Sequence, residues 1–142
     1  MYVDLINSIK ETLESVSGIK SVYPHPMREG DKISGYPAVV FYPDTSRNEF
    51  TTVRDNKKDY TFKIYVIVDA SQKSLDDIFT DILPNAVDKV TAEFDGDWEV
   101  SVEGASVSSW LIDSGLWTIS TTDKAFEAIA ELNLRVRMLV PV

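Results

Sequence analysis

The chain has 142 residues, of which 44% are hydrophobic and 26% charged, a balance typical of one globular domain spanning residues 1–142. It contains no cysteine, which excludes disulfides, thiolate nucleophiles and cysteine-based zinc sites. Its formal net charge of −9 argues against a tightly bound nucleic acid, because such binding depends on lysine and arginine side chains that neutralise phosphates.

The first elements in chain order are a helix and two short strands. The helix is predicted because apolar residues recur at helical spacing until Gly18, a typical stop. The strands are predicted over Ile19–Tyr23 and Tyr36–Tyr42, the second with Pro37 and Pro43 near its ends. The apolar residues of the helix are Leu5, Ile6, Ile9, Leu13 and Val16.

A β-hairpin is predicted next, with Asn48–Val53 and Tyr60–Asp69 as its arms. Apolar and polar side chains alternate along the second arm with the two-residue period of a strand. Between the arms, Arg54–Asp59 forms a polar, charged turn. This turn is either a solvated loop or a protruding contact for a neighbouring subunit.

A second helix is predicted after Ser74, a plausible N-cap followed by acidic residues that the helix dipole favours. The apolar residues between Leu75 and Phe94 share one broad face. Pro84 interrupts this pattern, so we expect a kink or two shorter helices. Opposite the apolar face, three acidic residues form either a solvated surface or an acidic surface repeated around an oligomer: Asp77, Asp81 and Asp88.

The remaining segments are predicted to be strands. One begins with Trp98–Val102 and another covers Val107–Ile112. The last segment alternates, and Leu134–Val140 cannot be helical without burying Arg135 or Arg137, so it is also predicted to be a strand. The expected fold is α+β, with a mostly antiparallel sheet, a long β-hairpin and two main amphipathic helices that flank it.

The sequence offers no recognisable catalytic motif. His25 is the only histidine and lies between two prolines, so an ordinary surface role is expected. Gly104–Ser108 begins like the nucleophile elbow of a hydrolase but lacks the closing glycine and a later histidine. Asp95, Asp97 and Glu99 form either a polar edge or a site for calcium or magnesium. We expect no catalytic, cofactor-binding or metal-binding residue.

Trp110 and Trp117 flank a stretch that includes Leu116 and a predicted glycine turn. Tryptophan is enriched at the hot spots of protein interfaces. Two tryptophans and a leucine beside a turn are also typical of a core, and both interpretations stay open.

The order of the elements resembles that of the tail terminator (tail completion) proteins of long-tailed bacteriophages. It is also similar to the wider set of small head–tail joining proteins. The resemblance covers nearly the whole chain and depends on the order of the elements and on the sequences of five predicted strand segments. These segments are Ile19–Pro24, Tyr36–Pro43, Asn48–Val53, Asp59–Val68 and Leu134–Val140.

The resemblance implies a structural virion protein, not an enzyme, that forms a homo-oligomeric ring, usually of six subunits. Such a ring caps the tail tube, ends its growth and joins it to the neck or head, while DNA passes through without specific binding. Its partners would be the tail tube protein and the neck or head-completion proteins, with assembly in the host cytoplasm. The expected subunit contacts are Phe50, Arg54, Lys57, Lys58, Trp110, Leu116 and Trp117. The acidic channel or surface face would be Asp77, Asp81 and Asp88.

Two alternatives remain at this point. One is a cytoplasmic α+β module that binds a small molecule or a peptide, which predicts a ligand-sized pocket. The other is a hydrolase that uses Asp95, Asp97 or Glu99. The charge distribution fits the ring, because residues 1–71 carry 9 basic and 10 acidic side chains and residues 72–142 carry 5 and 13. A like-charged wall would keep DNA from adhering.

Overall fold

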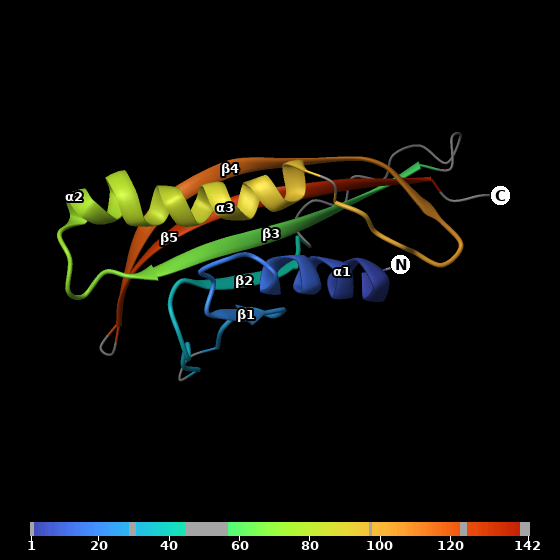
Figure 1. Cartoon of the computed structure of the whole chain (residues 1–142). Coiled ribbons are helices and arrows are strands. Elements are labelled where there is room, and N and C mark those ends of the chain that lie inside the picture. Colours follow the sequence, from blue (N-terminus) through green and yellow to red (C-terminus); the bar gives the residue numbers. More distant parts are fainter. Residues whose placement is uncertain (1, 29–30, 45–56, 97, 123–124, 140–142) are drawn as a thin grey trace.

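The computed structural model describes residues 2–28, 31–44, 57–96, 98–122 and 125–139 (Figure 1). No helix within these ranges is both long and apolar enough to cross a lipid bilayer. The elements in chain order are α1 (Tyr2–Glu14), β1 (Ser21–Tyr23), β2 (Ala38–Pro43), β3 (Lys57–Asp69), α2 (Leu75–Asp77), the π-helical segment η2 (Ile78–Ile82), α3 (Leu83–Asp95), β4 (Ser106–Thr122) and β5 (Ala125–Leu139).

One five-stranded sheet organises the molecule, with the strand order β1-β2-β3-β5-β4. The β1–β2 pair is parallel, and the β2–β3, β3–β5 and β4–β5 pairs are antiparallel. Figure 1 shows α1 and the α2–α3 segment over one face of this sheet, with α2 at one end of the molecule and the C-terminal end of β5 at the other. The expected α+β class with a mostly antiparallel sheet is confirmed. The longest antiparallel pair among the described residues is β4–β5, a different pair from the predicted hairpin of residues 48–53 with 60–69.

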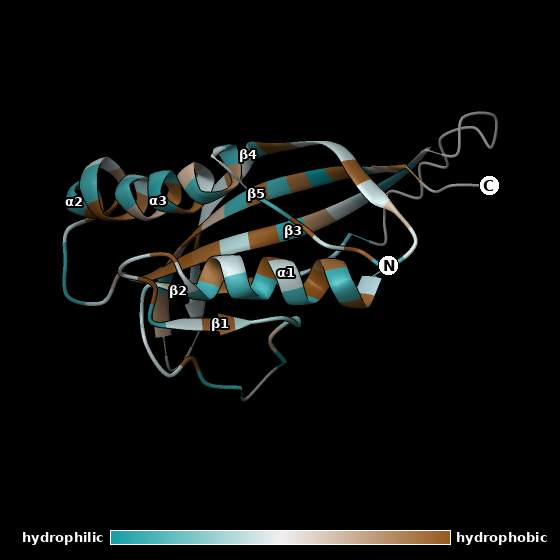
Figure 2. Ribbon diagram, turned by 45° about the vertical axis from the view of Figure 1, so that its right-hand side comes forward, coloured by the Kyte–Doolittle hydropathy of each residue, from teal (hydrophilic) through white to brown (hydrophobic). Residues whose placement is uncertain are grey.

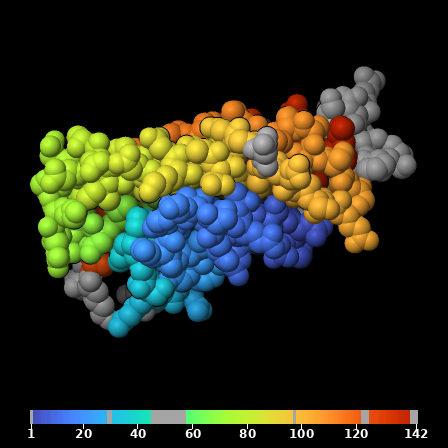
Figure 3. Space-filling model, viewed as in Figure 1, coloured from blue at the N-terminus to red at the C-terminus, as the bar shows by residue number. Residues whose placement is uncertain are grey.

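The main core lies between the sheet and the helices. The helix α1 buries Leu5, Ile9 and Leu13, as its spacing predicts. The space-filling view shows α1 and the α2–α3 segment side by side over the sheet (Figure 3), and the outward side of the helices is largely hydrophilic (Figure 2). The strand β5 supplies every second residue to this core: Ala128, Ala130, Leu132, Leu134, Val136 and Met138, all 0% exposed.

The second helix is interrupted where Pro84 predicts it. Ser74 caps its start, with its Oγ accepting a hydrogen bond from the backbone N–H of Asp77 at 3.2 Å. Pro84 has no N–H to bond to the carbonyl of Thr80, and its ring crowds that carbonyl. The chain widens into η2 just before this point and returns to the α-helical form at α3, where Pro84 lies in the first turn.

The other face of the sheet, here called the outer face, is turned away from the helices. A smaller apolar cluster of Ala38, Val40 and Ile67 lies on it, against side chains of the connection between β1 and β2 such as Met27 and Ile33. This connection covers the β1–β2–β3 part of the outer face. On the part formed by β5 and β4, the side chains of β5 are half-buried and those of β4, such as Leu111 and Asp113, are exposed.

Three sequence predictions about strands and turns are wrong. Residues 98–101 form no strand, because Trp98 packs against the rings of Phe94 and Trp110 and donates a hydrogen bond to Thr12 Oγ1 at 3.0 Å. Residues 57–59, predicted as part of a turn, begin β3 and pair with β5. The glycine turn near Gly115 is absent, since β4 continues past it to Thr122. The predicted hairpin arm 48–53 lies outside the described residues.

Candidate assembly surface

The strand β4 forms one edge of the sheet. Within the described ranges it pairs with β5 alone, so its other side presents backbone N–H and C=O groups without a neighbouring strand. Its 17 residues make it the longest of the described strands, with about 50 Å of backbone edge. The opposite edge of the sheet is β1, with only 3 residues. The long edge is therefore the stronger candidate for pairing with another chain.

The side chains of β4 add apolar surface to this edge. Leu111, Leu116 and Ile119 are 59%, 68% and 39% exposed. Asp113 is the only charged residue in the strand. Natural edge strands that stay unpaired usually carry several charges or a proline, which discourage association. β4 therefore lacks the charges and prolines that protect many sheet edges, and two register shifts are the protective device it has.

The two tryptophans of β4 lie on its core side. Trp110 donates a hydrogen bond from Nε1 to the carbonyl oxygen of Phe94 at 2.6 Å, and its ring meets Trp98 edge-on. Trp117 is half-buried, pairs with Ala130 and donates from Nε1 to Ser114 Oγ at 2.8 Å. These positions fit a core role better than an exposed contact.

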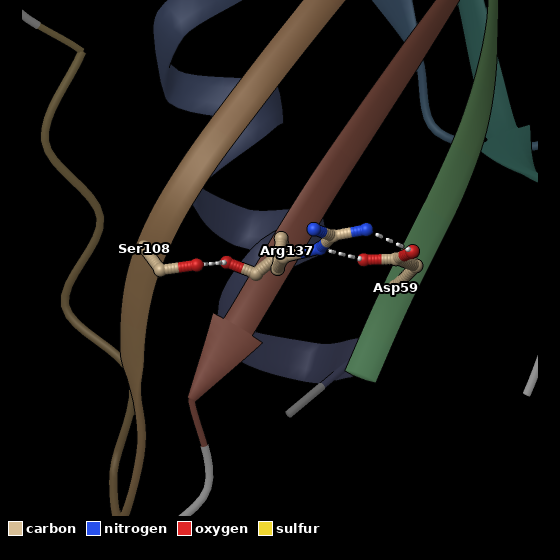
Figure 4. Close-up of polar contacts among 3 residues, drawn as sticks. All are labelled: Asp59, Ser108 and Arg137. Atoms are coloured by element: carbon tan, nitrogen blue, oxygen red, sulfur yellow. Dashed lines mark hydrogen bonds and ion pairs between the residues drawn. The ribbon is translucent and has the colours of Figure 1, made fainter. Parts of the chain in front are cut away.

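The outer face of the neighbouring strands carries an ion pair that ties β3 to β5 (Figure 4). Arg137 donates from Nε to Asp59 Oδ1 at 2.9 Å and from Nη2 to Oδ2 at 3.1 Å. On the other side, the Ser108 hydroxyl donates to the carbonyl oxygen of Arg137 at 3.2 Å. The hydrogen bonds from Arg137 lower the pKa of the Asp59 carboxyl, although its burial acts in the opposite direction. Three strands are thus linked near one end of the sheet.

A cavity of about 130 Å³ lies beside this ion pair. Arg135 pairs in register with Thr61 of β3 and Leu111 of β4, so its side chain shares the outer face with Leu111. Within the described part of the chain, Arg135 has no hydrogen bond or ion pair at contact distance. Its charge acts on the Asp59 carboxyl and helps to lower that pKa. The cavity is lined by Asp59, Ser109, Trp110, Leu111, Arg135 and Arg137.

The other predicted contact residues are dispersed. Leu116 is exposed on β4, as a contact requires. Lys58 is exposed but pairs with Met138, a core-facing residue, so it lies on the helix side of the sheet. Lys57 belongs to β3, but its side chain is not among the described parts of the structure. Phe50 and Arg54 lie outside the described residues. The predicted acidic face is accessible, since Asp77, Asp81 and Asp88 are all exposed.

The residues considered for chemistry do not converge on a site. His25 is exposed, and its Nδ1 lies 3.0 Å from the carbonyl oxygen of Pro26. Asp95 and Glu99 are exposed, and Asp97 lies outside the described residues. Among the residues that the structure describes, no three histidine or carboxylate side chains could hold a metal ion together.

Sequence reasoning did not select Asp59, Leu111, Arg135 or Arg137 as a group. Alternation along β5 placed both arginines on one face. Their proximity to Leu111 and Asp59 follows from the strand order, in which β5 lies between β3 and β4. Comparison of the chain with protein-family models and with curated proteins finds no match.

Proposed function

We propose that the protein is a structural subunit of a long-tailed bacteriophage that forms a hexameric ring at the end of the tail tube. The ring caps the tube, ends its growth and joins it to the neck or head, and DNA passes through it. Its neighbours are the tail tube protein and the neck or head-completion proteins. The observation that carries this proposal is the long open edge of β4 with its exposed apolar side chains.

The β4 edge supports assembly because its exposed backbone and apolar side chains suit contact with another chain. Exposing a backbone edge of this length together with Leu111 and Leu116 to water invites pairing with another chain. A subunit that works inside a ring buries such surface permanently, so its edge needs no protective charges. This argument favours a structural, oligomeric role over that of an isolated monomer.

The acidic helix supports the passage of DNA through the ring. Beyond the first turn of the α2–α3 segment, Asp81, Asp88 and Glu93 are exposed, with Lys89 as the exposed basic residue of the same stretch. An acidic wall repels the phosphate backbone and keeps DNA from adhering. The helix side of the subunit is therefore the better candidate for the channel.

The alternative of a small-molecule module gains no support from the cavity beside Arg135. Its volume of about 130 Å³ is well below the roughly 300 Å³ at which ligand pockets begin. An extended peptide, however, would also suit the β4 edge. The oligomeric state of the protein separates these two functions.

The decisive experiment is native mass spectrometry of the full chain over a concentration series, with and without magnesium. We expect a closed ring near six subunits, and electron microscopy of isolated tail tubes mixed with the protein should show it at one end. Leu111→Asp combined with Leu116→Asp should weaken the ring while leaving the circular dichroism spectrum unchanged. A tight dimer at every concentration, with no binding to tubes, would contradict the proposal.

A further inference from the structure

We infer that neighbouring subunits meet head to tail, with the start of α2 in one copy docked on the Arg135 pocket of the next. The docking segment is Leu75–Asp77, and the receiving surface comprises Leu111, Arg135 and Arg137. This inference rests on the proposed function, because it specifies which surfaces of the ring subunit touch.

The receiving surface has a positive charge in an otherwise acidic molecule. Arg135 and Arg137 contribute two guanidinium groups against one carboxylate, that of Asp59, which leaves one positive charge. Arg137 already holds Asp59 through two of its donors, whereas Arg135 offers all of its donors to an incoming group within the described structure. Leu111, 59% exposed, supplies an apolar wall. The surface therefore suits a carboxylate that is carried beside an apolar side chain.

The start of α2 has this combination of groups. Leu75 is 46% exposed, and both Asp76 and Asp77 beside it are exposed. The hydrogen bond from the Asp77 N–H to Ser74 Oγ fixes the first turn, so the carboxylates project from an ordered backbone. Arginine binds carboxylates through paired, charge-assisted hydrogen bonds. Charge and apolar character therefore match on the two surfaces.

The positions of the two surfaces require that they belong to different copies. Arg137 pairs with Asp59 near the start of β3, and α2 follows the end of that strand. Because β3 has 13 residues, the surfaces lie roughly 40 Å apart, at opposite ends of the molecule in Figure 1. When each copy binds the next through a different patch, the contact is heterologous, and its repetition produces a closed ring or a filament. An antiparallel symmetric dimer would make the same contact twice and stop at two subunits, so it would give a cross-linked dimer and no longer ladder.

Charge reversal tests the contact at equilibrium by native mass spectrometry and sedimentation. Arg135→Glu, or Asp76→Lys with Asp77→Lys, should raise the concentration at which the ring dissociates by roughly tenfold or more. Combining the three changes in one chain should restore much of the assembly, because the charges are then exchanged. Asp88→Lys is the matched control, since it removes an exposed acid from α3, outside the docking segment.

Thiol cross-linking tests the contact directly, because the natural chain has no cysteine. A chain with Leu75→Cys and Leu111→Cys, treated with a short bismaleimide, should give a ladder of covalent oligomers up to the ring. Each single variant should give no ladder, and neither should the pair Asp88→Cys with Leu111→Cys.

The outcomes separate the inference from the proposed function. If the wild-type protein forms a ring that Arg135→Glu and Asp88→Lys affect equally, and no ladder appears, the ring stands and the head-to-tail contact is overturned. If the wild type forms no ring, alone or on tail tubes, and the chain with Leu75→Cys and Leu111→Cys gives no ladder, both are overturned. Loss of assembly in Arg135→Glu with recovery in the combined variant supports the contact.

Discussion

The two faces of β5 share one backbone but differ completely in chemistry. The residues that face the helices are apolar and fully buried, whereas Glu131, Asn133, Arg135 and Arg137 alternate with them on the outer face. On the buried face, packing against the helices determines the free energy of unfolding. On the outer face, ion pairs and exposed charge determine what the surface can bind. One strand therefore serves stability and association at alternate positions.

The largest expected difference in the free energy of unfolding is between substitutions of two adjacent residues of β5 that lie on opposite faces. Leu134 is 0% exposed and lies opposite Phe62 and Ile112, so Leu134→Ala should lower the free energy of unfolding by about 2–5 kcal/mol. Arg135→Ala should change it by less than about 0.5 kcal/mol, because this residue has no hydrogen bond or ion pair at contact distance in the described structure. Urea denaturation of both variants measures the difference. Equal effects would show that β5 is not divided in this way.

The sequence predicts an element well when periodicity alone determines it. The alternation of Leu134–Val140 predicts the last strand, and β5 confirms it through Leu139. The alternation of Trp98, Val100 and Val102 has the same form but gives no strand. Trp98 fills the space between α1, α3 and β4, and residues 98–101 pair with no strand among the described elements. Periodicity shows which side chains share a face, not whether a partner strand is available.

The candidate surface was less predictable than the fold. The sequence indicated Leu116 as a contact but gave no reason to group Leu111 with Arg135, because the register of β4 on β5 is interrupted by two irregularities, one of which lies between the end of the hairpin and Leu111. One lies between Val107 and Ser109, and the other between Ser114 and Trp117. Each shifts the alternation by one residue and changes the face on which later side chains lie. Such shifts leave little trace in composition.

A smaller effect is expected from the ion pair on the outer face. Asp59→Asn removes the carboxylate charge that binds Arg137 and should lower the free energy of unfolding by about 1–2 kcal/mol at neutral pH. The effect is limited to this size because Arg137 is 42% exposed, so solvent screens the ion pair. The pKa of Asp59 is lowered in the folded state, so its contribution is present above the unfolded pKa of about 3.9 and is lost as the pH falls through the folded pKa.

The stability difference between wild type and Asp59→Asn should therefore shrink as the pH falls below about 4. Urea denaturation at a series of pH values measures it. Lys10→Met is a suitable control, because the pair of Lys10 with Glu14 is exposed on both sides and should contribute little. A difference that stays constant down to low pH would mean that the ion pair does not cause the effect.

The smallest expected effect is that of Gly115→Ala, in the irregular part of β4. A Cβ there would lie 3.2 Å from Asn133 Nδ2 and 3.2 Å from Glu131 Cδ, both on the outer face. Asn133 can rotate away, whereas Glu131 is held by Lys63 at 2.6 Å. The crowding opposes the gain of about 0.4–1 kcal/mol from restricting the unfolded chain, so the net change should be within about 0.5 kcal/mol.

Gly104→Ala is the informative control for this substitution. A Cβ at Gly104 would meet no atom within 4 Å, but its φ of +75° lies in the left-handed region, so alanine should cost about 1 kcal/mol. Urea denaturation should therefore rank the open position as the more sensitive of the two. The reverse order would mean that the Asn133 and Glu131 side chains are packed as rigidly as the core. In that case the outer face would be a fixed structure, and its charged side chains would be less free to adjust to a partner.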